Sequence, residues 1–261
     1  MEEGITEPIL RGKTDLLEWE VYKDRAAMGL AAAITTAKKI KSIMAVKKSV
    51  NIIFATAPSQ NEFLSSLAQM QDIDWSRVNA FHQDEYVGLP EDAPQRFGIY
   101  FKEHIAERIK LGQFFVINGN KNPVEESQRY SKLLEEYPVD ICCGGIGENG
   151  HIAFNDPHVA DFSDTFLVKE VTLDDTCRQQ QIHDGCFEKI ADVPKTAISL
   201  TVPALMKAKH VVVVVPSPTK AKAVYRALTG TISSEFPATI YRRHPSAVLY
   251  LEKASAALIL K

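Results

Sequence analysis

The sequence predicts an α/β fold with a mostly parallel sheet that is covered by helices on both faces. Short apolar runs alternate with longer Ala-rich or amphipathic stretches, as the strands and helices of such a fold do. Polar residues and glycines gather where these runs end, as they do at the carboxyl edge of such a sheet. The chain has 261 residues, and we see no repeat, low-complexity tract or linker in it, so we expect one domain, 1–261.

The elements follow in order from local patterns. Residues 1–17 show no clear period, and we expect a surface arm that could meet another subunit. Apolar runs predict strands at 49–56, 78–83, 114–117, 139–144, 166–173, 197–201, 210–215 and 247–251. Helical spacing, basic final turns or proline at the start predict helices at 22–46, 61–70, 95–110, 123–137, 174–187 and 218–228. The polar segment 161–194 around the fifth of these helices is a candidate lid.

Composition excludes several classes of protein. A net charge of −3 argues against a general nucleic-acid-binding surface. The longest strongly apolar runs, such as 210–216 with its five valines, are too short to span a membrane. The acidic start MEEGITEP lacks the regions of a secretion signal. The four cysteines form no CxxC pair, so we expect neither a zinc site nor disulfides, and the expected compartment is the cytoplasm.

The stretch 141–157, ICCGGIGENGHIAFNDP, predicts a functional site. An apolar run ends in a glycine-rich turn, and Asn149, His151 and Asp156 follow close together. Imidazole titrates near neutral pH, and a neighbouring carboxylate fixes its tautomer and raises its basicity. The alternatives are an ordinary surface histidine and an Asp156 that only shapes the turn before Pro157. GIGENG fits the bare GxGxxG pattern, but no helix opens there, so we predict no nicotinamide cofactor.

A second candidate is Asp84, which follows the apolar run VNAF. A carboxylate at a strand end, partly buried, can act as a general base. Since adjacent residues of an extended chain face opposite ways, we expect one of Asp84 and Glu85 in the pocket and the other in a structural role. The alternative for either is capping of the next segment.

A third group would bind an anion. Ser59 can cap a helix in ATAPSQNEFL, and Lys220 lies in PSPTK between a strand and a helix. Backbone N–H groups at such helix starts favour phosphate. The alternatives are plain capping for Ser59 and a solvated helix start for Lys220. Arg178 in CRQQQ is a further candidate.

Two of these motifs resemble one family. GIGENGHIAFNDP is similar to the GxGxxGHIAFNEP stretch of glucosamine-6-phosphate deaminases (isomerases), and HQDEYVGLP, 82–90, to their MDEYVGL motif. The likeness in chain plan runs from about 21 to 251. It implies a modified Rossmann-like three-layer α/β sandwich. It also implies conversion of an amino-sugar 6-phosphate to fructose 6-phosphate and ammonia, without metal or cofactor.

The resemblance assigns roles residue by residue. Asp84 matches the proton-transferring aspartate, His151 suits ring opening, and Lys220 matches the phosphate lysine. Asn149 lies within the family's range, whereas Asp156 stands where the family usually has glutamate. The family's TGxTP phosphate loop is replaced at 56–60, with Ser59 near its hydroxyl residue. Its lid arginine does not fall cleanly on Arg178.

Three questions stay open at this point. The related 6-phosphogluconolactonases share the fold, but their motifs read DERxVP and GHTASLFP, so the chain favours the deaminase. A non-catalytic sugar-phosphate-binding protein is the other alternative. The sequence leaves open whether the sugar is glucosamine or galactosamine 6-phosphate, and whether the protein forms a homo-oligomer.

Overall fold

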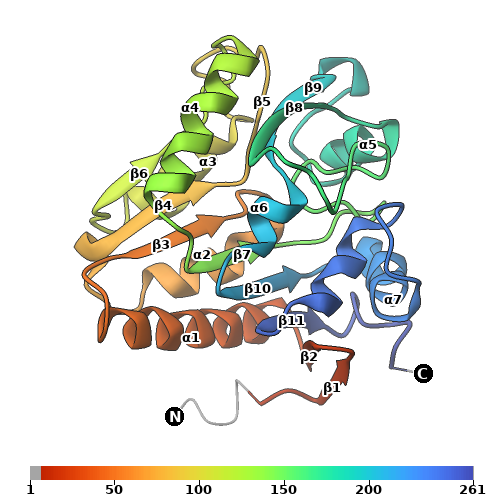
Figure 1. Ribbon diagram of the computed structural model, residues 1–261. Helices are drawn as coiled ribbons and strands as arrows, with labels where there is room; N and C mark the ends of the chain where they lie inside the picture. The colour runs from red at the N-terminus through yellow and green to blue at the C-terminus, as the bar shows by residue number, and fades with distance from the viewer. Residues whose placement is uncertain (1–6, 261) are drawn as a thin grey trace.

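The structure, a computed structural model, describes residues 7–260 and is built around an eight-stranded sheet (Figure 1). Its strand order is β1-β2-β11-β10-β7-β3-β4-β6. All neighbours from β2 to β6 pair in parallel, and only β1 runs antiparallel at the edge. The strands are β1 Leu10–Thr14, β2 Leu17–Tyr22, β3 Val50–Phe54, β4 Val78–His82, β6 Gln113–Phe115, β7 Ile141–Gly144, β10 His210–Val215 and β11 Ala247–Glu252. The predicted α/β class with a mostly parallel sheet is confirmed.

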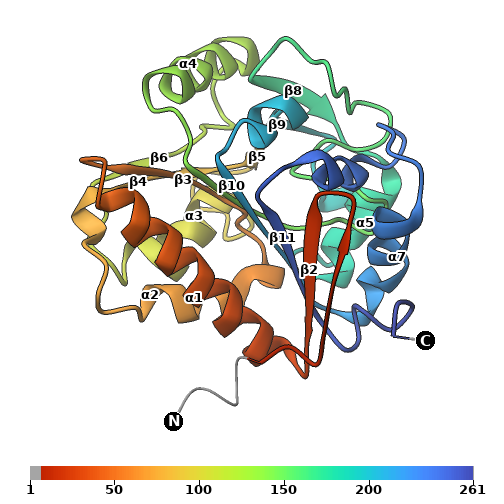
Figure 2. The ribbon, with the colours of Figure 1, turned by 60° about the horizontal axis from the view of Figure 1, so that its bottom comes forward.

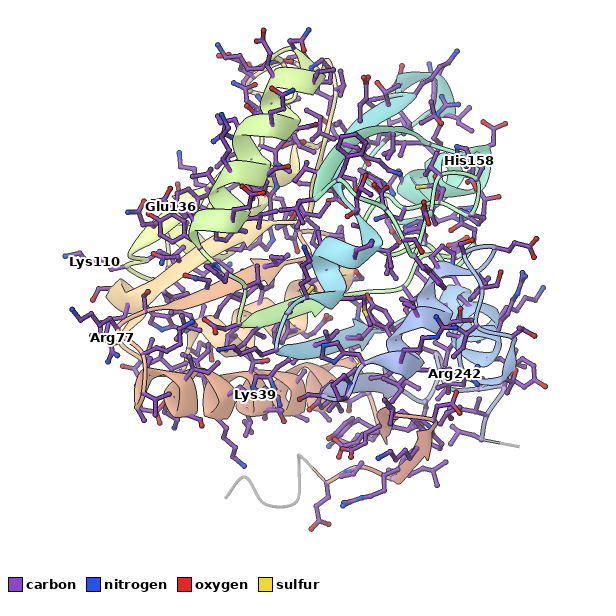
Figure 3. All side chains as sticks on the ribbon, viewed as in Figure 1. Lys39, Arg77, Lys110, Glu136, His158 and Arg242 are labelled. Carbon is purple, nitrogen blue, oxygen red and sulfur yellow. The ribbon has the colours of Figure 1, made fainter. Side chains whose placement is uncertain are left out.

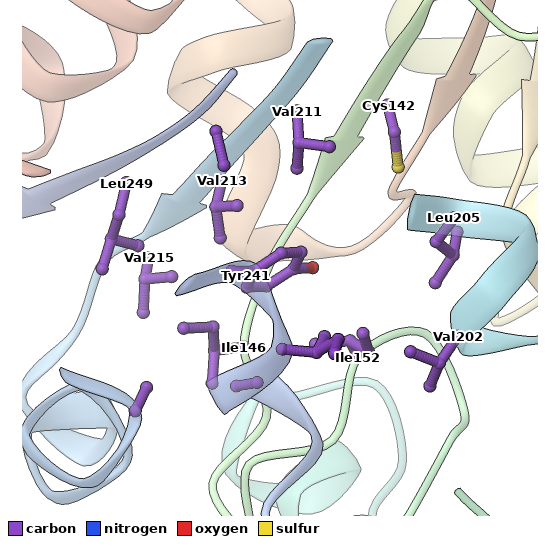
Figure 4. Packing of buried hydrophobic residues seen from close by; sticks show 14 of the residues in the cluster. Cys142, Ile146, Ile152, Val202, Leu205, Val211, Val213, Val215, Tyr241 and Leu249 are labelled. Atoms are coloured by element: carbon purple, nitrogen blue, oxygen red, sulfur yellow. The ribbon is translucent and has the colours of Figure 1, made fainter. Parts of the chain in front are cut away.

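Both faces of the sheet are buried because successive side chains point to opposite sides. On β10, Val211, Val213 and Val215 join one core cluster, and Val212 and Val214 join the other. Figure 4 shows the first cluster, in which the β10 valines face Tyr241 and the loop residues Ile146 and Ile152. A run of valines therefore forms a central strand with no polar face.

The helices form the two outer layers (Figures 1 and 2). α1 and α2 pack on one face, and α4, α6 and α7 contribute to the core on the other. Asp24 caps α1, which is rich in alanine where it meets the sheet and α2. The helices are α1 Arg25–Met44, α2 Asn61–Ala68, α3 Phe97–Phe101, α4 Pro123–Glu136, α5 Asp175–His183, α6 Val202–Met206 and α7 Ala221–Thr229. Short turns η1 Pro58–Gln60, η2 Trp75–Arg77, η4 Ile190–Asp192, η5 Pro218–Lys220 and η6 Pro237–Arg243 complete them.

A second, three-stranded antiparallel sheet lies beside the main one. It has the order β5-β9-β8, with β5 Asp84–Tyr86, β9 Thr196–Leu200 and β8 Val168–Thr172. The sequence predicted strands at 166–173 and 197–201 but not that they pair with each other, away from the main sheet. It missed β5, because its three residues have no apolar pattern although all are buried.

Two other predictions need correction. Residues 1–6 of the expected arm lie outside the described part of the chain, but β1 and β2 form a hairpin on the sheet edge instead of a free arm (Figure 2). Asp15 turns the hairpin with a φ of 53° and pairs with Arg242, which Figure 3 labels. The helix expected at 95–110 is shorter and changes character, because α3 passes into a π-helical turn, η3 Lys102–Ala106.

The chain order makes a crevice at the carboxyl edge of the main sheet. From β3 the chain proceeds to β4 and β6 on one side, and then crosses to β7, β10 and β11 on the other. The loops after β3 and β7 therefore separate, which is where open α/β sheets bind ligands. Within residues 7–260, no helix is long and apolar enough to cross a membrane.

Candidate active site

A pocket that opens to solvent occupies this crevice. Its walls come from the loops after β3, β4, β7 and β10 and from the last turn of α5. Four of the predicted site residues line it, namely Ser59, Asp84, His151 and Lys220. Asn149 and Asp156 do not line the pocket but contact His151. The structure thus gathers residues that are up to 161 positions apart in sequence (59 to 220).

The His151 ring is held by a network of hydrogen bonds. Its Nδ1 lies 2.8 Å from Asn149 Oδ1 and 3.2 Å from Asp156 Oδ1. The backbone N–H of His151 also donates to Asn149 Oδ1, at 3.0 Å. Asn149 Nδ2 donates to Asp156 Oδ1 at 2.9 Å. With Nδ1 engaged on the side of the network, Nε2 is the ring nitrogen left for chemistry in the pocket.

Asp156 carries the negative charge of this network. Its side chain is fully buried, and it accepts a second hydrogen bond from the backbone N–H of Asp174, at 2.9 Å. Burial by itself would raise the pKa of Asp156. The hydrogen bond and charge of His151, together with Asn149 and the Asp174 N–H, outweigh burial and lower the pKa below its ordinary value. Asp156 is therefore ionised at neutral pH and can stabilise a protonated His151.

Two glycines make room for this arrangement. A Cβ on Gly147 would lie 2.1 to 2.3 Å from three atoms of the His151 ring, so the ring rests directly on the glycine backbone. Gly150 has a φ of +86°, and a Cβ there would also meet the ring of Phe236 at 2.5 Å. Gly147 and Gly150 thus leave room for the His151 ring and for Phe236. Residues 147–150 form a turn and no helix.

Asp84 and Glu85 face opposite ways on β5. Glu85 accepts hydrogen bonds from the backbone N–H groups of Tyr86, Phe97 and Gly98, two of which open α3. Asp84 instead lines the pocket, and the residue is 7% exposed. Burial first, and then the charge of Glu85, raise the pKa of Asp84 to about 8. This value suits a group that exchanges protons near neutral pH.

Lys220 lies at the other wall of the pocket. The residue is 3% exposed, and among the described residues its Nζ has no hydrogen-bond partner. Burial lowers its pKa, whereas Asp184 and Glu148 raise it. Two further buried atoms of the pocket lining, Thr56 Oγ1 and Gln60 Oε1, have no partner within residues 7–260 either. Unpaired buried polar atoms around one pocket indicate the place of a polar ligand.

The 56–60 segment lies between β3 and α2 and lines the pocket, as expected for an anion-binding loop, but it lacks the expected helix cap. Ser59 lies in the turn η1 ahead of α2, and its Oγ accepts a hydrogen bond from Gln60 Nε2 at 3.1 Å. It does not cap α2, because neither η1 nor α2 has a side-chain cap. The capping interpretation of Ser59 is therefore wrong, and its hydroxyl hydrogen can still be donated toward the pocket.

Arg178 does not reach the pocket. Its Nη2 donates to the backbone carbonyls of Ile190 and Val193, at 2.6 and 3.1 Å, and its Nη1 pairs with Asp175. It braces the segment after α5, and within residues 7–260 no arginine lines the pocket. The structure thus places Arg178 away from the pocket, with Nη1 and Nη2 bound elsewhere and Nε without a partner among the described residues, which does not support the expected phosphate contact.

Sequence reasoning missed several polar residues of the site. Gln180, Gln181 and Asp184 of α5 and Gln83 after β4 line the pocket, and Asp174 binds Asn149 Nδ2 at 2.8 Å. Gln83 belongs to the HQDEYVGLP motif, which is the signal that could have found it. The other four belong to no motif, and their only signal was that they fall in the segment predicted to be a lid, which stays a prediction.

Two groups of side chains are close enough to suggest a metal site. One is His151, Asp156 and Cys177, and the other is Asp156, His158 and Asp174. Figure 3 places His158 at the outer surface beside α5. Burial keeps the pKa of Cys177 well above its usual range, so the thiol is protonated, and Asp156 already accepts hydrogen bonds on both oxygens. The donors fit a hydrogen-bonded network better than metal coordination, and a metal-free site stays a prediction.

Comparison with known proteins places the chain in a family. The family model described as glucosamine-6-phosphate isomerases/6-phosphogluconolactonase matches residues 23–250. The chain belongs to this family. It is 34% identical over 206 residues to a glucosamine-6-phosphate deaminase of Streptococcus sanguinis, covering 78% of this chain and 85% of that protein. It is 35% identical over 224 residues to one of Bacillus cereus, covering 85% and 82%.

Solved structures agree with this assignment. A monomeric glucosamine-6-phosphate deaminase superposes with a TM-score of 0.84 and 28% identity, covering 92% of this chain and 99% of that chain. A 6-phosphogluconolactonase from Thermotoga maritima gives 0.75 at 18% identity, covering 91% and 100%. The second likeness concerns the fold alone. The chain therefore has the Rossmann-like sandwich fold that its motifs predicted.

Proposed function

We propose that this protein is a deaminase that converts an amino-sugar 6-phosphate, glucosamine 6-phosphate or its galactosamine epimer, to fructose 6-phosphate and ammonia. The observation that carries the proposal is the composition of one pocket. It joins a carboxyl group of raised pKa, Asp84, to a histidine backed by a buried carboxylate, His151, and to an unpaired ammonium, Lys220. Relatives named glucosamine-6-phosphate deaminase support it.

The first step would be opening of the sugar ring. A proton must move from the C1 hydroxyl to the ring oxygen, and His151 suits that transfer because its Nε2 is free while Nδ1 is bound to Asn149 and Asp156. The imidazolium formed in passing is stabilised by the ionised Asp156. Ring opening neither gains nor loses a proton overall, so the histidine ends the step as it began.

The second step would be a proton transfer between carbons. Ionised Asp84 removes the C2 proton, the electron pair forms the C1=C2 bond, and the C1 carbonyl oxygen gains the proton that the substrate's ammonium group gives up, which leaves an enolamine. The same carboxyl group then returns its proton to C1 while the nitrogen lone pair forms the C2=N bond. The C2 amine becomes an imine, water adds to it, and ammonia leaves. The substrate's nitrogen carries the electrons in this sequence, and Asp84 is regenerated.

Lys220 would hold the 6-phosphate. Its buried and unpaired Nζ is the natural partner of an anion, and Thr56 and Ser59 can add hydroxyl donors from the loop after β3. The remaining orphan, Gln60 Oε1, can accept only a hydrogen bond and so suits a substrate hydroxyl or a water. The Ala57–Pro58 departure from the family loop leaves this end of the pocket dependent on Lys220.

The test is an ammonia-release assay on glucosamine 6-phosphate and galactosamine 6-phosphate, with 6-phosphogluconolactone hydrolysis measured beside it. We expect ammonia from at least one amino sugar, and loss of this activity in Asp84→Asn. Hydrolysis of the lactone alone would support a lactonase instead. Binding of the amino sugar without turnover would identify a sugar-phosphate-binding protein and contradict the proposal.

A further inference from the structure

Asp174 lies outside the pocket, and its carboxylate has two partners. Oδ1 accepts a hydrogen bond from the backbone N–H of Cys177, at 2.6 Å, and so caps α5. Oδ2 accepts one from Asn149 Nδ2, at 2.8 Å. Capping alone would explain the first contact but not the second. We infer that Asp174 is a positioning residue for the reaction, which acts through Asn149 to fix the tautomer of His151.

The orientation of the Asn149 amide follows from its neighbours. Nδ2 lies between two carboxylates, 2.9 Å from Asp156 Oδ1 and 2.8 Å from Asp174 Oδ2. Ionised carboxylates can only accept hydrogen bonds, so the NH₂ group must face them with both of its hydrogens. Oδ1 then points the other way, toward the backbone N–H and ring Nδ1 of His151.

This orientation decides where the imidazole carries its proton. An amide oxygen 2.8 Å from Nδ1 can only accept, so Nδ1 must be the protonated nitrogen and Nε2 the basic one. A reversed amide would place a donor against Nδ1 and leave only the longer contact to Asp156 Oδ1, at 3.2 Å, to hold the proton there. The Nε2–H form, which is the wrong form for a base in the pocket, would then become more populated. The His151 N–H favours the same orientation, and Asp174 supplies the acceptor for the second amide hydrogen.

The identities of the two residues depend on each other. A carboxylate at position 149 would face the carboxylates of Asp156 and Asp174 at hydrogen-bond distance, and the three would repel. An asparagine at 149 instead needs two acceptors, and Asp156 alone offers only one of them. Asp174 is therefore the complement of Asn149, and it joins the His151 network to the first turn of α5, the helix that brings Gln180 and Gln181 to the pocket.

The inference rests on the proposed function only for its kinetic readout. In Asp174→Asn the new side chain can still cap α5 with its oxygen, but its NH₂ group then faces the NH₂ group of Asn149. Asp174→Ser keeps a residue that caps helices well, but its shorter side chain cannot accept the hydrogen bond from Asn149 Nδ2. We expect kcat to fall roughly ten-fold or more in both, the loss of one hydrogen bond to a charged group, with KM changed by less.

Asp175→Asn is the matched control. It removes the same charge from the adjacent residue in the first turn of α5, where the side chain is exposed and contacts Arg178 but not Asn149. We expect its kcat and melting temperature to equal those of the wild type. If Asp174→Asn and Asp174→Ser were as active as this control, the carboxylate would serve only as a cap and the inference would fail.

The second readout needs no substrate. Nitrogen-15 NMR of the histidine side chains distinguishes a proton on Nδ1 from one on Nε2, and comparison with His151→Gln assigns the His151 signals. We expect the Nδ1–H form in the wild type and in Asp175→Asn, and a mixture or the Nε2–H form in both Asp174 variants. An unchanged spectrum would overturn the inference whatever the enzyme turns over, so its failure differs from failure of the proposed function.

An exchanged pair completes the test. Asn149→Asp combined with Asp174→Asn places an acceptor where the donor was and a donor where the acceptor was. We expect the double variant to lose less activity than the product of the two single losses, since the bridge can form in reverse. Losses that simply multiply would show that the two residues act independently, which would contradict the inference.

Discussion

Lys220 is an unusual residue, because its ammonium is buried and has no hydrogen-bond partner in the described part of the chain, residues 7–260. Such a group lowers the stability of the empty protein and is retained where a ligand supplies the missing charge. The sequence placed Lys220 between a strand and a helix, which is enough to expect a helix-start anion site. It could not show that the side chain would be buried and unpaired, since that depends on the loop after β3 and on α5.

We expect Lys220→Ala to raise KM for the amino-sugar 6-phosphate by roughly ten- to a hundred-fold and to change kcat much less. The reason is that a phosphate contact is made equally in the ground and transition states. Steady-state kinetics with Lys222→Ala as the control check this, because Lys222 is exposed in the first turn of α7, the helix that Lys220 precedes. Equal turnover of free glucosamine and its 6-phosphate by the wild type would show that Lys220 has another role.

Asp156 carries the buried charge beside His151, and this charge is predicted to matter more than the shape of the side chain. In Asp156→Asn an NH₂ group would face either Asn149 Nδ2 or the Asp174 N–H, and a protonated His151 would lose its counter-charge. We expect kcat to fall about ten-fold or more and the pH–rate profile to shift. A substrate already in the open-chain form should bypass much of the loss.

The same variant reports on stability. The pKa of Asp156 lies below its ordinary value, so the ionised group stabilises the folded state at pH values above about 4, and this contribution disappears as the pH falls through the folded-state pKa. Asp156→Asn should therefore unfold more easily at neutral pH. Unchanged kcat, pH profile and stability would favour the alternative in which Asp156 only shapes the turn before Pro157.

At the scale of elements, the strand–turn unit from β7 to Phe154 was predictable because each of its parts has a local cause. Apolar residues give a buried strand, and glycines give the turn. The structure adds the reason for one particular glycine, since the His151 ring lies against Gly147. The neighbouring Gly145 has ordinary space around it, because a Cβ added there would have its nearest neighbours at 3.4 and 3.6 Å.

This contrast gives a prediction. Gly147→Ala should lower the free energy of unfolding by about 1–3 kcal/mol, the usual effect of overpacking a tight site, and displace His151. Gly145→Ala should change the free energy of unfolding by no more than roughly 0.5 kcal/mol. Urea unfolding of the two variants beside the wild type measures both values. Equal effects of the two substitutions would contradict the contact geometry.

Other elements could not be predicted because their causes are not local. β5 consists of two acidic residues and a tyrosine, and it becomes a strand by pairing with β9. The β1–β2 hairpin has no Asn-Gly or Asp-Gly turn, and Arg242, 227 residues away from Asp15, holds its tip. The second sheet likewise depends on pairing between segments that the sequence showed only as separate apolar runs.

At the scale of the whole molecule, the order of the strands does most to create the site. The crevice exists because the chain reverses its direction of travel across the sheet between β3 and β7. The alternation of strands and helices predicted the parallel sheet and the edge at which Asp84, His151 and Lys220 would meet. It did not predict that α5 would close one side with Gln180, Gln181 and Asp184, because nothing in a polar helix indicates which loop it covers.

The buried carboxyl groups of this edge should make activity and stability respond to pH in opposite directions. The pKa of Asp84 is about 8 and that of Glu85 about 7, both raised mainly by burial. The folded protein keeps a proton that the unfolded chain has lost between about pH 4 and pH 8 at Asp84, and between about pH 4.5 and pH 7 at Glu85. Each group therefore lowers the free energy of unfolding by up to about 1.4 kcal/mol per pH unit as the pH rises through its window. The ionised form of Asp84 that catalysis needs increases over the upper part of the same window, so kcat should rise toward pH 8.

Asp84→Asn separates the two effects. It cannot ionise, so it should unfold less readily than the wild type at pH 7–8 and show a weaker dependence of stability on pH. It should also lose roughly 10²–10⁴-fold in kcat while binding the substrate nearly as well, since a general base is removed and the shape is kept. Urea unfolding at pH 6, 7 and 8, with kcat and substrate affinity measured at the same pH values, checks both expectations.

A variant that kept activity within a few-fold of the wild type would remove Asp84 from the mechanism. A variant that was no more stable at pH 8 would show that the cost of burying this carboxyl group is met elsewhere in the fold.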